Sequence, residues 1–228
     1  MFRPVDGGSE KPLVSASILS ADSGALREEA VRLEQAGADS IIHVDVMDGH
    51  FVPNISFGPE LVRALHAHLR IPLQVHLMLE RPGSFIPSFA DGGADMLIFH
   101  YECAEDLRHL AGSTEAARCK AGVAINPETQ FSLVRDVLPL FGLLLIMGVH
   151  PGLGGQAFID DTLEKVGEAK AFIERERLET VIAVDGGVKL ENSRKVLDAG
   201  ADQLVVGSYL SSAADAKTAI GRLKEIAD

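Results

Sequence analysis

Ala-Gly-Ala-Asp-Ser-Ile-Ile-His-Val-Asp-Val, residues 36–46, is the stretch that decides the fold class of this chain. A glycine in this position commonly ends a helix, and the apolar, β-branched run that follows predicts a buried strand. The same phrase returns at Ala199–Asp202 before another apolar run, and Gly92–Asp95 is a close variant before a third. The repetition of helix, glycine turn and strand predicts a parallel sheet covered by helices.

Eight short apolar runs divide the chain. They predict strands at Leu13–Leu19, Ser40–Val46, Leu73–Met78, Met96–His100, Ala121–Ile125, Gly142–Val149, Thr180–Val184 and Gln203–Val206. Between them, apolar residues recur with helical spacing, as at Ala25–Ala36 and Thr162–Glu176. Eight such units in 228 residues favour a single (β/α)8 TIM barrel over an open doubly wound sheet. We expect residues 1–12 to form a loose leader and residues 13–228 to form one catalytic domain.

The composition excludes several classes of partner. The chain carries 33 acidic and 21 basic residues, a formal net charge of −12, and an acidic surface repels nucleic acid and anionic membranes. The two cysteines, Cys103 and Cys119, make no disulfide framework and are interpreted as reduced thiols of a cytoplasmic protein. The first residues lack the apolar segment of a signal peptide, and no apolar run has transmembrane length. A small phosphorylated substrate stays compatible with this charge, because backbone amides can bind phosphate.

Histidines and aspartates gather at the predicted carboxyl ends of the strands, where TIM barrels carry their chemistry. His43 and Asp45 are two residues apart on one strand, so their side chains point to the same side. His76 and Asp185 end two further strands and can converge with them. Buried together without a partner, these four groups would be poorly satisfied. The set predicts a site for one divalent metal ion, with Zn2+, Fe2+, Mn2+ and Co2+ all suited to mixed nitrogen and oxygen ligands.

Three glycine-rich turns follow the last three strands. They are Gly152-Leu153-Gly154-Gly155, Asp185-Gly186-Gly187 and Gly207-Ser208. A glycine loop alone is commonly a plain turn. TIM barrels, however, frequently bind phosphate at the loops after their last strands, on backbone amides that glycine leaves accessible. The three turns together therefore favour a phosphate cradle.

Three methionines and a serine also follow strands. Met47, Met78 and Met147 are either core filler, the commoner fate of methionine, or a water-excluding cap over a reacting carbon. Ser17 is either a hydroxyl donor to substrate or a residue that closes a strand end.

Other polar residues near strand ends are not assigned a role. His50 is interpreted as a solvated or hydrogen-bonded loop residue, and neither His100 nor His150 is required by the chemistry. Asn126-Pro127 is a turn that can contact the site.

With these residues in place, the sequence resembles the ribulose-phosphate 3-epimerase family from about Val14 to Ser208. The most diagnostic segment is His43–Asn54, which reads HVDVMDGHFVPN. The other matching segments, in the order of the family, are Ser17–Asp22, Val75–Met78, Asn126–Pro127, Pro151–Gln156 and Val184–Gly187. The resemblance implies a TIM barrel of the ribulose-phosphate-binding type. It also implies a metal-dependent isomerase of carbohydrate phosphate metabolism that interconverts D-ribulose 5-phosphate and D-xylulose 5-phosphate at C3.

The resemblance also implies a role for each site residue. His43, Asp45, His76 and Asp185 would bind the metal, and Asp45 and Asp185 would be the acid/base pair of a two-base proton transfer through an enediolate. The substrate would contact Ser17, His76, Met47, Met78 and Met147, and its phosphate would lie on Gly152, Leu153, Gly154, Gly155, Gly186, Gly187, Gly207 and Ser208. Barrels of this type often associate, so a homo-oligomer is expected.

Three alternatives stay open. An epimerase for a related ketose phosphate, such as allulose 6-phosphate, would use the same chemistry. Barrels that decarboxylate or condense sugar phosphates carry a D-x-K-x-x-D pattern, but here the second strand reads Asp45-Val46-Met47-Asp48 without a lysine. The third alternative is a non-catalytic barrel that binds metal or phosphate.

The chain departs from the family pattern at five positions. Ala16 stands where proline is usual, Gly148 and His150 replace serine and asparagine, and Leu153 replaces an aromatic residue. One residue is inserted near Ser40, which predicts a bulge or shifted turn before His43. None of these changes removes a proposed catalytic group.

Overall fold

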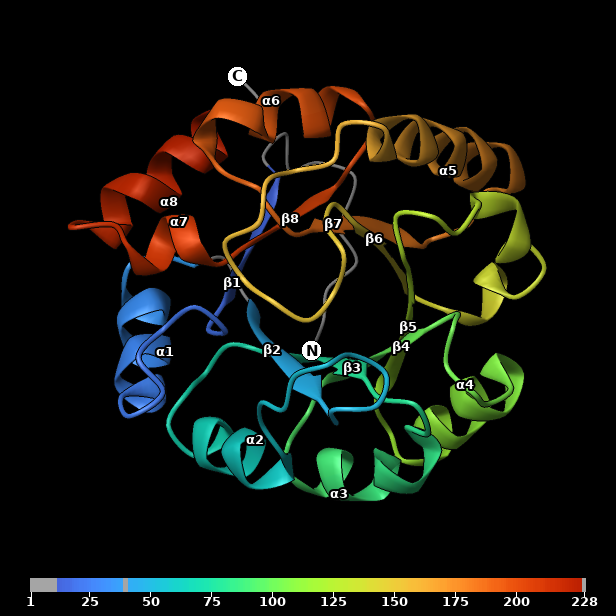
Figure 1. The fold of residues 1–228 in the computed structure, drawn as a ribbon, viewed down its shortest axis with the longest axis horizontal. Coiled ribbons are helices and arrows are strands. Elements are labelled where there is room, and N and C mark those ends of the chain that lie inside the picture. Colours follow the sequence, from blue (N-terminus) through green and yellow to red (C-terminus); the bar gives the residue numbers. More distant parts are fainter. Residues whose placement is uncertain (1–11, 39–40, 227–228) are drawn as a thin grey trace.

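The computed structural model describes residues 12–38 and 41–226, so most of the expected leader and Ser40 lie outside the described residues. Eight parallel strands pair in chain order and close into a barrel, β1 to β8 and back to β1 (Figure 1). The strands are β1 (Leu13–Ser17), β2 (Ile41–Met47), β3 (Leu73–Met78), β4 (Met96–His100), β5 (Lys120–Ile125), β6 (Leu143–Met147), β7 (Val181–Asp185) and β8 (Gln203–Val206). The predicted single TIM barrel is confirmed.

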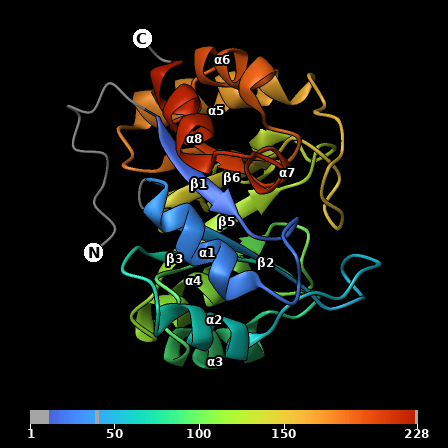
Figure 2. The same ribbon diagram turned by 90° about the vertical axis from the view of Figure 1, so that its left-hand side faces the viewer.

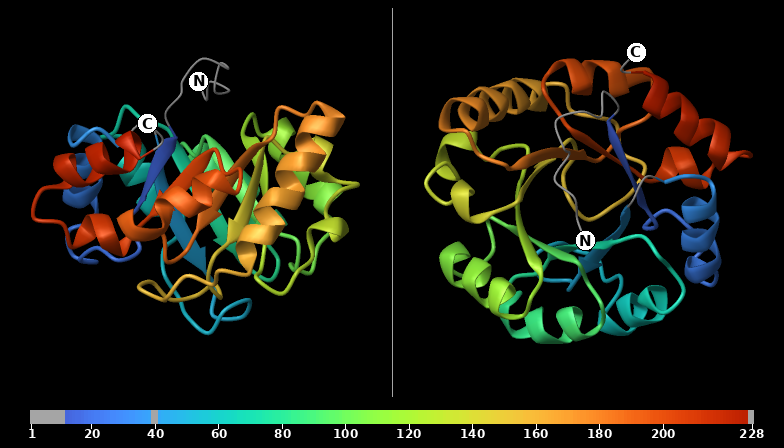
Figure 3. Two further views of the ribbon diagram at one scale, coloured as in Figure 1. Left: turned by 90° about the horizontal axis from the view of Figure 1, so that it is seen from above. Right: turned by 180° about the vertical axis from the view of Figure 1, so that it is seen from behind.

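The helices form an outer ring around the barrel, as seen from either end (Figures 1 and 3). They are α1 (Leu26–Gln35), α2 (Pro59–His66), α3 (Ile86–Asp91), α4 (Leu107–Ala116), α5 (Thr162–Glu176), α6 (Leu190–Asp198), α7 (Ser208–Ser211) and α8 (Ala216–Glu225). Three short 3-10 helices lie at η1 (Gly83–Phe85), η2 (Phe131–Leu133) and η3 (Leu138–Leu140). None of the helices in the described ranges is long and apolar enough to cross a membrane.

Burial on both faces explains the apolar strands. All seven residues of β2 are buried, because one face packs on the helices and the other fills the barrel. The register places Asp45 beside His76 and Met147 beside Asp185. The pairing of β2 with β3 runs without a break from Ile42 to Met47, so the register is regular by His43. Asp39 and Ser40, where the bulge or shifted turn is predicted, lie outside the described residues.

The repeated glycines end helices at the amino-terminal face, as predicted. Gly37, Gly93 and Gly200 have positive φ angles of 90°, 97° and 114° after α1, α3 and α6. At the opposite face, the segments that follow β2 and β6 project beyond the barrel, as the side views show (Figures 2 and 3). The barrel therefore separates plain structural turns from long loops that can form a site.

Candidate active site

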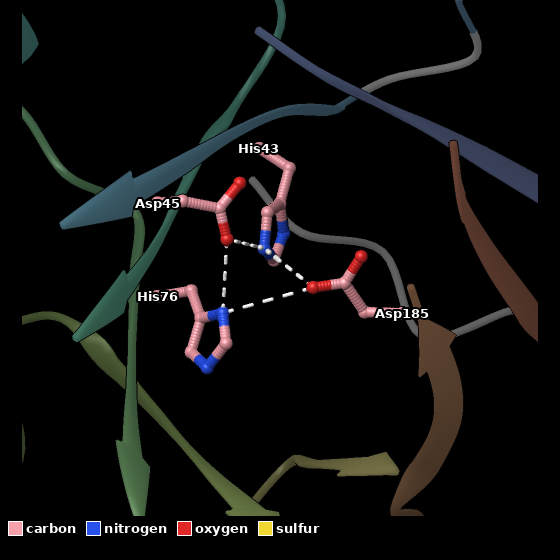
Figure 4. Close-up of side chains that lie close together, drawn as sticks. All are labelled: His43, Asp45, His76 and Asp185. Atoms are coloured by element: carbon pink, nitrogen blue, oxygen red, sulfur yellow. Dashed lines mark hydrogen bonds and ion pairs between the residues drawn. The ribbon is translucent and has the colours of Figure 1, made fainter. Parts of the chain in front are cut away.

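Four side chains from three strands meet at the carboxyl end of the barrel (Figure 4). His43 and Asp45 come from β2, His76 from β3 and Asp185 from β7. Nδ1 of His76 lies 3.1 Å from Oδ1 of Asp45 and 3.8 Å from Oδ2 of Asp185. Nε2 of His43 lies 3.3 Å and 3.8 Å from the same two oxygens. One ligand atom from each residue therefore lies within 4.8 Å of the other three.

The four groups have strongly shifted pKa values. Burial disfavours the charged form of His43, but the carboxylates of Asp45 and Asp185 outweigh it and raise the pKa of the imidazole to about 9. Burial lowers the pKa of His76 to about 4, and the neighbouring His100 works in the same direction. Near neutral pH, His43 therefore carries the additional proton and His76 is neutral.

The two carboxyl groups are shifted in opposite directions. Burial alone would raise the pKa of Asp45, but the charge of His43 and the hydrogen bonds from both histidines hold it well below its usual range. Burial and the nearby charge of Asp45 raise the pKa of Asp185 to about 7. Near neutral pH, one carboxyl group is ionised and the other can carry a proton.

The residues fit a divalent metal ion. Nε2 of His43 is buried and has no hydrogen-bond partner among the described residues, although it faces the two carboxylates. Its other nitrogen, Nδ1, lies 2.8 Å from Oε1 of Gln74. Because an amide oxygen only accepts, Gln74 holds the proton of neutral His43 on Nδ1 and leaves a lone pair on Nε2 directed at the site. Two imidazoles and two carboxylates with one free lone pair match the ligands that Zn2+ and similar ions prefer.

Ser17 lies against the site from the end of β1. Its hydroxyl donates a hydrogen bond of 2.8 Å to Oδ2 of Asp45. Oδ1 of the same carboxylate faces the histidines, so one oxygen accepts from Ser17 and the other interacts with His43 and His76. In this structure Ser17 orients Asp45.

A cleft opens above the four side chains. All the residues predicted to hold phosphate line it, and so do Ser17, Asp45, Asp185 and the three methionines. No lysine or arginine of the described chain lines this cleft. An anion in the cleft would therefore be held by backbone amides and hydroxyl groups.

The turn after β7 requires its glycines. Gly187 has a φ of 66°, and a Cβ atom there would lie 2.7 Å from the backbone nitrogen of Phe158. Gly148, where the family usually has serine, is equally confined, because a Cβ atom would lie 2.5 Å from the ring of Phe158. Leu153 is 66% exposed at the mouth of the cleft, and Ala16 is buried in the barrel wall.

The three methionines are core residues that also reach the wall of the cleft. Met47 and Met78 pack with Val52 in a small apolar cluster, and Met147 belongs to the core inside the barrel. All three are nearly fully buried, yet each also lines the cleft.

The structure separates the remaining histidines. His50 is exposed and is held to the loop residue Asp48, and His150 is exposed and paired with Glu128. Neither belongs to the four-residue set. His100, which the sequence left without a role, is fully buried and lies against His76.

Two supporting residues were missed by sequence reasoning. Ser20 lines the cleft, and its hydroxyl lies close to both Gly154 and Gly207. Gln74 fixes the tautomer of His43. A signal existed for Gln74, which is two residues before His76 on one strand and so shares its face.

Comparison with known proteins agrees with this geometry. A model of the ribulose-phosphate 3 epimerase family matches residues 13–211. The chain is 44% identical to the ribulose-phosphate 3-epimerase of Bacillus subtilis (strain 168) over 212 residues, which are 92% of this chain and 97% of that protein. It is 43% identical to the ribulose-phosphate 3-epimerase of Chlamydia trachomatis serovar D over 199 residues, which cover 86% and 85% of the two chains.

Solved structures show the same fold. The 3-hexulose-6-phosphate synthase of Salmonella typhimurium superposes with a TM-score of 0.69 at 16% identity, covering 94% of this chain and 97% of that one. At this identity the likeness concerns the fold alone. The family match and the close relatives go further, and the chain belongs to the ribulose-phosphate 3 epimerase family.

Proposed function

We propose that this protein interconverts D-ribulose 5-phosphate and D-xylulose 5-phosphate by inverting C3, with one divalent metal ion bound by His43, Asp45, His76 and Asp185. The observation that carries the proposal is the convergence of two carboxyl groups and two imidazoles, whose ligand atoms all lie within 4.8 Å of one another, in a chain of the epimerase family. Epimerisation beside a ketone removes a proton from one face of the carbon and returns a proton to the other face. One ionised and one protonated carboxyl group supply both halves of that exchange.

In this mechanism Asp45 and Asp185 work as a pair. Asp45, held ionised by the histidines and oriented by Ser17, takes the C3 proton of one epimer. Asp185, whose raised pKa lets it carry a proton near neutral pH, delivers that proton to the opposite face. In the reverse direction the roles exchange. A bound divalent ion would supply Lewis-acid stabilisation of the negative charge that develops on the substrate.

The cleft gives the substrate its position. The glycine-rich turns after β6, β7 and β8 provide backbone amides for the phosphate. Met47, Met78 and Met147 cover the reacting carbon and exclude water, which limits exchange of the transferred proton with solvent.

Two sequence predictions stay predictions. They are a cytoplasmic location and association into a homo-oligomer. Sedimentation of the purified protein at several concentrations tests the second.

Turnover of D-ribulose 5-phosphate in a coupled assay tests the function. The protein is assayed as purified, after chelation, and after addition of Zn2+, Fe2+, Mn2+ or Co2+. Loss of activity on chelation and recovery with metal would support the proposal, and the metal that restores the highest kcat/KM identifies the preferred ion. Absence of turnover with every metal would contradict it, and turnover of allulose 6-phosphate instead would move the proposal to that substrate.

A further inference from the structure

Behind the metal set, the buried His76 and His100 and the partly buried Glu102 form a row that the proposed proton transfer does not use. Nδ1 of His76 faces the metal set, and the other ring nitrogen points away from His43, Asp45 and Asp185 (Figure 4). That atom, Nε2, lies 2.8 Å from Nε2 of His100, which is the last residue of β4. The two rings are stacked at 4.9 Å between centroids. Nδ1 of His100 then lies 3.1 Å from Oε2 of Glu102.

Only one proton can lie between the two facing Nε2 atoms of neutral histidines, so two arrangements are possible. In the first, His76 donates from Nε2 to His100, and His100 donates from Nδ1 to Glu102. Nδ1 of His76 then carries a lone pair toward the metal set. In the second, His100 donates from Nε2 to His76, and the proton of His76 lies on Nδ1, where it blocks a cation.

Glu102 distinguishes the two arrangements once a cation is bound. Without one, the first arrangement would leave Nδ1 of His76 and Oδ1 of Asp45, 3.1 Å apart, as two facing acceptors, and a cation between them removes that conflict. In the second, Nδ1 of His100 would present a lone pair to a carboxylate oxygen 3.1 Å away, and two acceptors would face each other. Glu102 is held as an acceptor on its other side too, because Oε1 accepts from the amide of Asn126 at 2.9 Å and from the hydroxyl of Thr129. Burial would raise the pKa of Glu102, but hydrogen bonds from His100, Thr129 and the amide of Asn126 hold it below its usual value.

We propose that Glu102 and His100 are positioning residues that fix the tautomer of His76, so that its Nδ1 offers a lone pair to the metal. The inference rests on the metal site of the proposed function. The two histidine ligands are then held by different means, His43 by the neutral amide of Gln74 and His76 by a buried histidine that ends on a carboxylate. A charged acceptor at the end of the row also makes His76 a stronger ligand, since it increases the electron density on the imidazole.

Glu102→Gln is the variant that tests the row. The amide group keeps the shape of the side chain but offers only one acceptor oxygen, and the fixed N–H of Asn126 requires it. The new NH2 group then faces Nδ1 of His100, which favours the second arrangement. We expect the affinity for Co2+, measured by titration of the metal-free protein, to fall by about 10- to 100-fold. The visible spectrum of the bound Co2+ should also change, which loss of packing alone would not cause.

Glu128→Gln is the matched control. Glu128 lies in the loop after β5, its side chain is exposed, and it pairs with His150 outside the row. The substitution removes the same charge, so its Co2+ affinity and spectrum should equal those of the wild type. Wild-type affinity in a folded Glu102→Gln variant would overturn the inference.

A measurement on the wild type keeps the test independent of whether the variant folds. Long-range 1H–15N correlation of histidine-labelled protein loaded with Zn2+ reports which nitrogen carries each proton. We expect His100 to be protonated at Nδ1. Protonation of His100 at Nε2 would overturn the proposed role of His100 and Glu102 while leaving the metal site intact. A wild-type protein that takes up neither Zn2+ nor Co2+ would overturn the proposed metal site and the row with it.

Discussion

The end of β2 and the end of β7 each bring one aspartate to the same site, but they hold it differently. The carboxylate of Asp45 has three side-chain partners, which are His43, His76 and the hydroxyl of Ser17. Asp185 is followed by two glycines with φ angles of 102° and 66°, and burial beside a second carboxylate raises its pKa to about 7. One strand end therefore stabilises a negative charge and the other destabilises it.

This difference shows how a single residue type can serve as acid and as base in one site. The chemical groups are identical, so the division of roles comes from the surroundings alone. The same division makes the site suited to a cation. A divalent ion would replace the proton on His43, while Asp185 can keep the proton that it delivers in the reaction.

The largest expected effect comes from removing either carboxylate. Asp45→Asn and Asp185→Asn should each lower kcat by about 10²- to 10⁴-fold, because an amide can neither take nor deliver the proton. Activity is measured in the coupled assay at saturating metal, and circular dichroism checks that the barrel is intact. Near-native turnover in either variant would contradict the two-base mechanism.

Proton exchange sharpens the contrast between the two aspartates. In D2O, Asp185→Asn retains Asp45 as a base and should incorporate deuterium at C3 of one epimer without forming the other. Asp45→Asn should do so with the opposite epimer. Mass spectrometry of recovered substrate measures the exchange, and identical behaviour of the two variants would remove the distinction.

The second effect is the pH dependence of metal binding. The pKa of His43 is raised to about 9, so below this value His43 must lose a proton when a cation binds. Asp185 can keep the proton that the mechanism requires, so the association constant should rise about tenfold per pH unit below pH 9 and level off above it. Competition with a chromophoric chelator across pH 6 to 10 measures the curve.

A variant of one aspartate tests whether His43 accounts for that curve. Asp185→Asn removes a negative charge that helps to raise the pKa of His43. Binding should weaken at every pH, and the curve should level off at a lower pH, with the same slope of about tenfold per unit below it. A wild-type affinity that does not vary between pH 7 and 9 would show that His43 binds no proton there.

The sequence predicted the barrel and the convergence of His43, Asp45, His76 and Asp185, because strand alternation and parallel pairing determine which side chains share a face. It could not predict the row behind His76. His100 lies at a strand end like the other site residues, but only the packed distance of 2.8 Å shows that it faces Nε2 of His76. Such contacts depend on side-chain rotamers and on barrel closure, which spacing along the chain does not encode.

A third effect concerns stability at the end of β7. Gly187→Ala should lower the free energy of unfolding by about 2 to 5 kcal/mol, because it adds a left-handed backbone penalty to a clash with the backbone of Phe158. Gly155→Ala is the matched control, since Gly155 has a φ of 76° but a Cβ atom would meet nothing within 4 Å. That variant should lose only about 1 to 2 kcal/mol. Urea unfolding measures both, and equal losses would show that crowding at Gly187 is relieved by a shift of the loop.

The smallest effect should come from Ser17→Ala, at the end of β1 beside Asp45. Loss of the 2.8 Å hydrogen bond frees Oδ2 of the carboxylate to turn, and we expect kcat/KM to fall by about tenfold. The pKa of Asp45 rises when a donor is lost, but it starts well below its usual range, so the base stays ionised and the pH profile above pH 5 should not move. Ser56→Ala is the control, because Ser56 donates to the backbone oxygen of Asp45 and leaves its carboxylate alone. Should the Ser17→Ala profile shift toward higher pH while Ser56→Ala stays unchanged, the two histidines would not be enough to hold Asp45 ionised, and the contrast with Asp185 would depend on the serine.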